Sequence, residues 1–118
     1  EAMVRSRGEG WRVPLDVEPT LDQYGVVDPA ERRWMAERLV PHPWKTFDDR
    51  LRLPTSRYRA LPRTFVLCTR GRSSPGQGAE RAQREPGWRL REIDTGHDAM
   101  VTAPRELVDR LLEAAKVR

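Results

Sequence analysis

The sequence predicts an α/β fold whose regular part lies in the second half of the chain. From residue 63 onward, apolar strand-like runs alternate with helical segments, which is typical of parallel strands covered by helices. The first half holds isolated tryptophans and many prolines instead. The large apolar residues expected to form a core lie beyond residue 60 and are Phe65, Val66, Leu67, Leu90, Ile93, Leu107, Val108, Leu111 and Leu112.

The first segment, residues 1–27, is expected to be irregular with short extended pieces. Gly8 and Gly10 predict a turn between Val4 and residues 11–15. A proline inside the second arm restricts such a hairpin to the edge of a sheet.

A helix is predicted over residues 28–39. Asp28 is a favourable N-cap, Pro29 suits the first turn, and Glu31 completes a capping box. The helix should end before Pro41, because a proline disfavours the helical conformation in the residue that precedes it.

The remainder is expected to form a connection followed by a strand, a helix, a strand, a turn and a helix. Residues 41–62 hold four of the ten prolines and predict an extended connection. The strands are expected over 63–69 and 88–94, and the helices over 79–85 and 104–115. Two parallel strands leave sheet faces and edges without neighbours. The sequence therefore favours an incomplete chain whose packing partner is absent.

Composition and charge argue against several classes of protein. The 118 residues suffice for one small domain, with 37% hydrophobic and 34% charged residues. The net charge is +4 and the pI about 10.0, but acidic residues interrupt the arginines throughout, so we expect no nucleic-acid partner. No apolar stretch approaches the length of a bilayer span and no signal peptide is present, which predicts a cytoplasmic protein without a membrane partner. The start at Glu1 leaves open a fragment, a processed chain or a recombinant product.

A single cysteine, Cys68, excludes an internal disulfide and cannot make a metal site by itself. It lies within an apolar run, so a buried and inert thiol is expected. We expect neither a cofactor nor a metal.

The candidate for chemistry is His97, on a glycine-containing turn just after the second strand. In open α/β sheets, ligands bind outside the carboxyl ends of the strands. A histidine there is suited to proton transfer near neutral pH. The alternative is a turn histidine that only bonds to nearby backbone.

The stretch Asp94-Thr95-Gly96-His97-Asp98-Ala99-Met100, followed by Thr102-Ala103-Pro104 and a helix, resembles the end of α/β-hydrolases. The branch holds plant methyl-ester esterases, hydroxynitrile lyases and many bacterial esterases. The resemblance implies a cap segment over residues 1–60, with residues 8–15 as its hairpin and 28–39 as its helix. It also implies that residues 61–118 are the last strands and helices of the hydrolase core.

By this resemblance, His97 is the general base that deprotonates a serine nucleophile and later protonates the leaving alcohol. Such a serine lies on a G-x-S-x-G elbow, and none of the four serines here, Ser6, Ser56, Ser73 and Ser74, has the paired glycines. The resemblance therefore assigns the nucleophile and the oxyanion hole to a missing N-terminal half, which would be a partner of this chain.

The triad acid departs from the family pattern, because Gly71 stands where the family has an aspartate. Three alternatives stay open: an acid from the missing half, a water that orients His97, or reduced activity. Asp94 and Asp98 flank the histidine, but adjacent residues on a tight turn seldom point at one another's rings.

Further residues bear on the substrate. Met100 is a candidate substrate-binding residue in the acyl pocket, the alternative being simple packing. Trp11, Trp34 and Trp44 are suited either to wall a hydrophobic cleft or to fix the proline-rich cap to the main domain. Asp98 stands where hydroxynitrile lyases carry a lysine, and its opposite charge disfavours a lyase.

We expect this chain to be part of a serine hydrolase, namely a carboxylic esterase whose substrate is a small-molecule ester. The chain alone is expected to be inactive. Two alternatives are kept. One is an α/β-hydrolase fold without hydrolytic activity, acting as a lyase, a cyclase or a binding protein. The other is an independent basic interaction module. The oligomeric state stays open, and a homodimer is compatible with the sequence.

Overall fold

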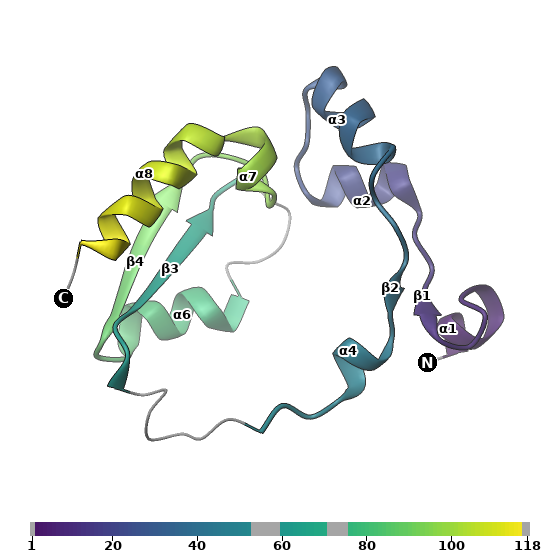
Figure 1. Ribbon diagram of the computed structural model, residues 1–118, viewed down its shortest axis with the longest axis horizontal. Coiled ribbons are helices and arrows are strands. Elements are labelled where there is room, and N and C mark those ends of the chain that lie inside the picture. Colours follow the sequence, from purple (N-terminus) through teal and green to yellow (C-terminus); the bar gives the residue numbers. More distant parts are fainter. Residues whose placement is uncertain (1, 53–59, 71–75, 117–118) are drawn as a thin grey trace.

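The computed structural model describes residues 2–52, 60–70 and 76–116, with helices and strands mixed along the chain (Figure 1). The elements of the first half are α1 (Ala2–Arg7), β1 (Arg12–Val13), α2 (Val17–Gln23), α3 (Pro29–Ala36), β2 (His42–Pro43) and α4 (Lys45–Asp48). Those of the second half are β3 (Arg63–Cys68), α6 (Gly76–Arg84), β4 (Trp88–Ile93), α7 (Ala99–Thr102) and α8 (Pro104–Ala115).

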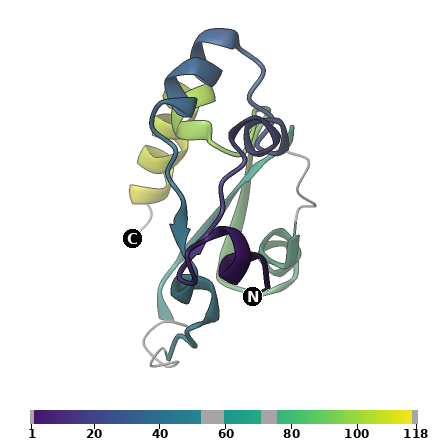
Figure 2. The ribbon, with the colours of Figure 1, turned by 90° about the vertical axis from the view of Figure 1, so that its right-hand side faces the viewer.

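Strands β3 and β4 pair in parallel, as the alternation of strands and helices predicted. Their register runs from Arg63 opposite Trp88 to Cys68 opposite Ile93. Helices α6 and α8 lie on opposite faces of this two-stranded sheet (Figures 1 and 2). The mixed architecture with a small parallel sheet is compatible with an α/β fold.

Helix α6 packs closely on β3 because a glycine faces the strand. A Cβ added at Gly78 would lie 2.5 Å from a ring carbon of Phe65. The helix begins at Gly76, three residues before the predicted start at Ala79. The prediction missed this first turn because it treated the glycines as loop residues.

The helix predicted at Asp28 is confirmed, with an earlier end. The Asp28 carboxylate accepts hydrogen bonds from the backbone N–H groups of Ala30 and Glu31, at 2.8 and 2.9 Å. The helix ends at Ala36 instead of Leu39. The N–H groups of residues 38 and 39 both donate to the Met35 carbonyl, which closes the last turn before the proline.

Three predictions for the first half are wrong. Residues 2–7 form helix α1 instead of an irregular stretch, and α2 was not predicted. Strand β1 pairs antiparallel with β2, Arg12 opposite Pro43, instead of forming a hairpin with the segment at Val4. The glycines after α1 end that helix: the N–H groups of Gly8 and Gly10 both donate to the Val4 carbonyl.

A buried apolar cluster lies in the first half of the chain, where no core was predicted. Leu21, Val26 and Met35 are buried between α2 and α3, and Val101 of α7 packs against them. Arg32 joins the two helices through ion pairs with Glu18 and Asp22.

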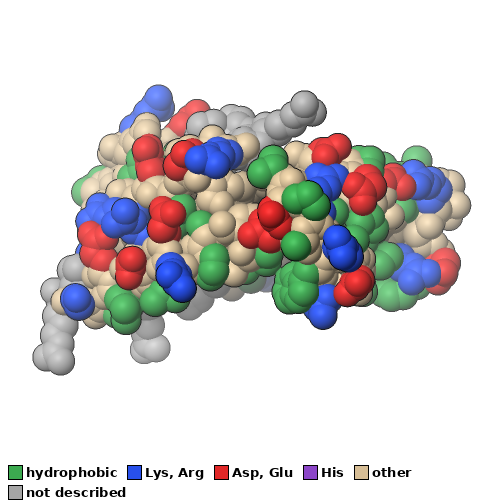
Figure 3. Space-filling view, turned by 90° about the horizontal axis from the view of Figure 1, so that it is seen from above, with side chains coloured by type: hydrophobic (Ala, Val, Ile, Leu, Met, Phe, Trp, Pro, Cys, Tyr) green, Lys and Arg blue, Asp and Glu red, His purple; other side chains and the backbone are tan. Residues whose placement is uncertain are grey.

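Of the nine residues predicted for a core, only Ile93 is fully buried. Val108, Leu111 and Leu112 of α8 are more than half exposed, because the sheet beneath that helix is only two strands wide. Apolar side chains lie between acidic and basic ones on the face of the molecule seen in Figure 3. The Cα radius of gyration is 16.8 Å, above the roughly 13–14 Å of a compact domain of this length. Within the described residues, no helix has the length and apolar character needed to cross a bilayer.

Candidate functional site

His97 lies on the turn that follows β4, at the carboxyl end of the parallel strands. The turn is exposed at His97, whereas Thr95 and Gly96 before it are buried. The side chain thus stands at the edge of the sheet where ligands of open α/β folds bind. The short helix α7, which was not predicted, begins two residues later.

Hydrogen bonds of Thr95 hold the turn against the end of β3 and against α7. The Thr95 carbonyl accepts from the Arg70 backbone N–H at 2.9 Å, which ties the turn to the end of β3. The hydroxyls of Thr95 and Thr102 lie 2.6 Å apart and share a hydrogen bond, which ties it to α7.

The turn is also fixed by the segment that follows α2. The backbone N–H of His97 donates to the carbonyl oxygen of Tyr24 at 2.7 Å. The Tyr24 ring lies against the imidazole, with centroids 5.1 Å apart and planes tilted by 40°. The sequence predicted neither contact, because no local pattern relates residues so far apart in the chain.

Glycines allow the two backbones to approach. A Cβ at Gly96 would lie 2.5 Å from the Tyr24 carbonyl oxygen and 2.8 Å from that of Gly25. Gly25 has φ +70°, a conformation that favours glycine, and a Cβ there would lie 3.0 Å from the Arg70 carbonyl oxygen. Only glycines fit both positions without displacing backbone.

Neither carboxylate that flanks His97 in the sequence contacts its ring. Asp94 accepts hydrogen bonds from Arg70, through Nε at 2.7 Å and through a terminal nitrogen, and from the Thr69 hydroxyl at 3.1 Å. The hydrogen bonds from Arg70, and secondly from Thr69, hold the pKa of Asp94 below its ordinary value. Asp98 is half-buried. Among residues 2–52, 60–70 and 76–116, no carboxylate bonds to the His97 ring; Gly71 lies outside these ranges.

Met100, the candidate substrate-binding residue, lies on α7 with 61% of its surface exposed. Among the tryptophans, Trp11 and Trp34 are about half exposed and Trp44 is half-buried. Trp34 stacks under the Arg38 guanidinium, 4.4 Å from the ring centroid. The backbone N–H of Trp44 donates to the Trp11 carbonyl at 2.8 Å, which links the two extended pieces β1 and β2.

Cys68 ends β3 and is half-buried instead of fully buried. Burial raises the pKa of its thiol, against a smaller opposite effect of the Ala99 N–H. The protonated thiol is therefore favoured, as expected for an inert cysteine. In the part of the chain that the structure describes, no group of three metal-ligating side chains comes together.

A cleft opens beside the turn, between the α2–α3 segment and the sheet. Its lining comes from both halves of the chain and consists of Gly25, Val27, Glu31, Arg70, Thr95, Gly96 and Thr102. The polar groups available there are the Glu31 carboxylate, the Arg70 guanidinium and the threonine hydroxyls. The cleft brings residues of the predicted cap next to the predicted catalytic turn.

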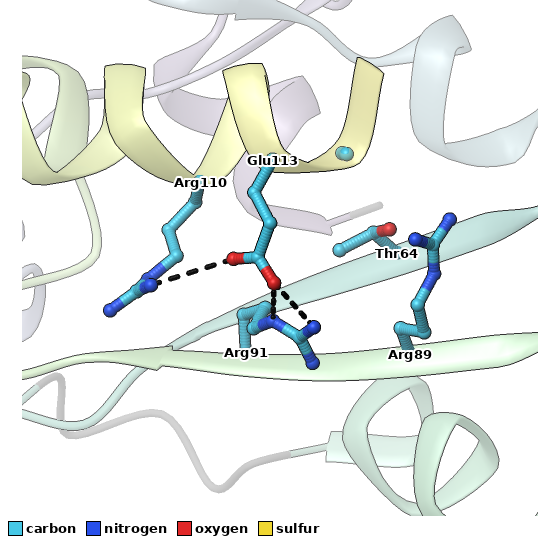
Figure 4. Close-up of a pocket in the computed structure, with 6 residues that line it drawn as sticks. Thr64, Arg89, Arg91, Arg110 and Glu113 are labelled. Carbon is cyan, nitrogen blue, oxygen red and sulfur yellow. Dashed lines mark hydrogen bonds and ion pairs between the residues drawn. The ribbon is translucent and has the colours of Figure 1, made fainter. Parts of the chain in front are cut away.

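A second charged cluster lies between α8 and the sheet, toward the start of the strands (Figure 4). Glu113 accepts from Arg91 at 2.8 and 2.5 Å and forms an ion pair with Arg110 at 3.5 Å. These contacts join α8 to β4 and leave no space for a ligand between them. We interpret the cluster as structural.

The chain is similar to a known esterase. It is 30% identical over 82 residues to a carbendazim hydrolyzing esterase of Nocardioides sp. (strain SG-4G), and the match covers 69% of this chain. The chain spans about a third of the length of that relative, the match covering 34% of it. No family model and no solved structure matches the chain. The similarity supports a distant relationship to an esterase.

Proposed function

We propose that this chain is part of a serine hydrolase that cleaves a small carboxylic ester, with His97 as the general base. The observation that carries the proposal is the position of His97, exposed on a firmly held turn at the carboxyl end of a parallel strand. The distant similarity to an esterase supports the reaction class.

In this proposal, the imidazole of His97 accepts the serine proton as the serine oxygen attacks the ester carbonyl. It then gives that proton to the departing alkoxide, which leaves as an alcohol, and the acyl group stays bonded to the serine oxygen as an acyl-enzyme. A water molecule, deprotonated by the same imidazole, attacks the acyl carbonyl. The bond to the serine oxygen breaks, the acid leaves, and the imidazole returns the proton to the serine. The ring is exposed on one side and therefore accessible to a nucleophile.

The serine and the oxyanion hole are proposed to lie in an N-terminal half that this chain lacks. The two-stranded sheet and the exposed apolar side chains of α8 support this, since both offer surfaces for further sheet and helix packing. So does the match to only a third of the esterase. Residues 1–60 would then act as a cap over the site, with Met100 lining the acyl pocket.

The experiment uses the longer protein encoded by the gene from which this chain comes. A fluorophosphonate probe should label a serine upstream of residue 1, at a G-x-S-x-G sequence, and mass spectrometry of the labelled peptide should identify it. The proposal predicts that labelling is slowed at least a hundredfold, on the order of a lost general base, in the His97→Ala variant. Labelling at an unchanged rate would contradict it.

A second candidate is a hydrolase-fold protein without hydrolysis. The specific observation in its favour is that Asp94, one of the two carboxylates that flank His97 in the sequence, is bound by Arg70. A protein without labelling that still binds small esters with micromolar affinity would support this alternative over the esterase.

A further inference from the structure

We infer that Tyr24 is a positioning residue for His97, so that the segment after α2 controls the orientation of the base. The inference rests on the proposed function, since it treats His97 as a catalytic base. It extends that function by naming a residue, in the other half of the chain, through which the cap region acts on the site.

The contact between Tyr24 and His97 has two parts, and both restrict the position of the imidazole. The Tyr24 carbonyl holds the His97 backbone at 2.7 Å, and the Tyr24 ring faces the imidazole at 5.1 Å. The first fixes where the side chain begins, and the second restricts the rotation of its ring. The tilt of 40° between the rings is an ordinary geometry for an aromatic pair.

An exposed histidine needs such a restraint to act as a base. An unrestrained imidazole on a surface turn samples several rotamers, and only one of them places a ring nitrogen against a nucleophile. In serine hydrolases a carboxylate usually holds the ring. No carboxylate in the described part of this chain does so. Tyr24 is the side chain there that lies against the ring.

Tyr24 is itself held in place. It is half-buried and packs against the cluster of Leu21, Val26 and Met35, and its N–H donates to the Thr20 carbonyl at 2.9 Å. Val101 of α7 packs against the same cluster. The cluster therefore supports the catalytic turn from both sides, through Tyr24 at His97 and through Val101 four residues later.

A movement of α2 and α3 relative to β4 would displace Tyr24 and the apolar cluster that holds it. Gly96 packs against the backbone of residues 24 and 25, so a displacement of this segment would move the Tyr24 side chain relative to the turn. Displacement of the cap region is thus expected to change the orientation of the imidazole as well as access to the site.

The first test is kinetic and uses the full-length protein with a small chromogenic ester. Tyr24→Leu removes the aromatic face, and Tyr24→Phe keeps it. We expect kcat to fall roughly ten- to a hundredfold in Tyr24→Leu, with KM changed by less than about twofold, because orientation and not substrate binding is lost. Tyr24→Phe should restore kcat to nearly the wild-type value. Phe47→Leu, an aromatic-to-leucine change on exposed α4, should leave kcat unchanged.

The second test is spectroscopic and uses the two histidines of the chain. Within the described residues, the aromatic ring beside His97 is that of Tyr24, and the one beside His42 is that of Phe47, at 5.0 Å with planes at 62°. In proton NMR, Tyr24→Leu should therefore shift the ring signals of His97 and spare those of His42. Phe47→Leu should do the reverse.

The outcomes separate the two claims. If the wild-type protein is inactive but the His97 signals still respond to Tyr24→Leu, the contact between the two rings is confirmed. The proposed ester hydrolysis is then contradicted, and with it the positioning role of Tyr24. An active wild-type protein whose kcat is unchanged in Tyr24→Leu overturns the positioning role alone. Equal losses of kcat in Tyr24→Leu and Tyr24→Phe would also overturn it, since the ring face survives in the phenylalanine.

Discussion

Gly96 lies directly under the backbone of Tyr24, at a distance that leaves no room for a side chain. A Cβ at Gly96 would be 2.5 Å from the Tyr24 carbonyl oxygen, closer than nonbonded atoms approach. This contact joins the turn that carries His97 to the segment after α2. It makes the two halves of the chain interdependent at the candidate site.

Gly96→Ala is therefore expected to destabilise the fold by roughly 1–3 kcal/mol, because backbone and not a flexible side chain must move. Urea unfolding measures this. Gly10→Ala is the contrast: a Cβ added at Gly10 would have no atom within 4 Å, and only the φ of +80° opposes alanine, at a cost of about 1 kcal/mol. A Gly96→Ala variant as stable as Gly10→Ala would contradict the close approach.

The cluster between α2 and α3 is expected to carry much of the stability. Leu21 is fully buried, and Leu21→Ala should cost about 2–5 kcal/mol in the free energy of unfolding. Leu51 is 80% exposed, and Leu51→Ala should stay within about 0.5 kcal/mol of the wild type. Equal effects of the two substitutions would show that this cluster is not a core.

The attachment of α8 should depend on pH. Hydrogen bonding to Arg91, assisted by its charge, lowers the pKa of Glu113 in the folded chain. A carboxyl whose pKa is lowered by folding stabilises the fold at pH values above its ordinary pKa of about 4.5. This contribution is lost as the pH falls through the pKa that the carboxyl has in the folded chain. Glu113→Gln should thus lower the thermal midpoint near neutral pH, and its difference from wild type should shrink below about pH 4. A difference independent of pH would contradict the role of this ion pair.

Local signals predicted the elements that depend on local chemistry. The Asp28 cap with Pro29 placed α3, and the apolar run bounded by a proline placed β3. The start of α8 at Pro104 follows from the same kind of signal. Helix α2 escaped prediction because its apolar positions are few and Pro19 lies within its first turn, where a proline is tolerated.

Tertiary relationships could not be predicted in the same way. The pairing of β1 with β2 and the contact of Tyr24 with His97 join residues that no sequence period relates. The predicted core failed for a related reason: leucines at helical spacing on α8 indicate an apolar face but not whether anything covers it. The position of His97 at the end of β4 followed from the order of elements alone.

The central proposal is that His97 is the general base of an ester hydrolase. The most direct test measures kcat of the full-length protein on a p-nitrophenyl ester, with each of the two histidines replaced in turn. Loss of a triad histidine is expected to lower kcat by at least about a thousandfold. His97→Ala should show this loss, whereas His42→Ala, an exposed histidine packed on Phe47, should keep the wild-type kcat. An active enzyme whose kcat survives His97→Ala would contradict the account.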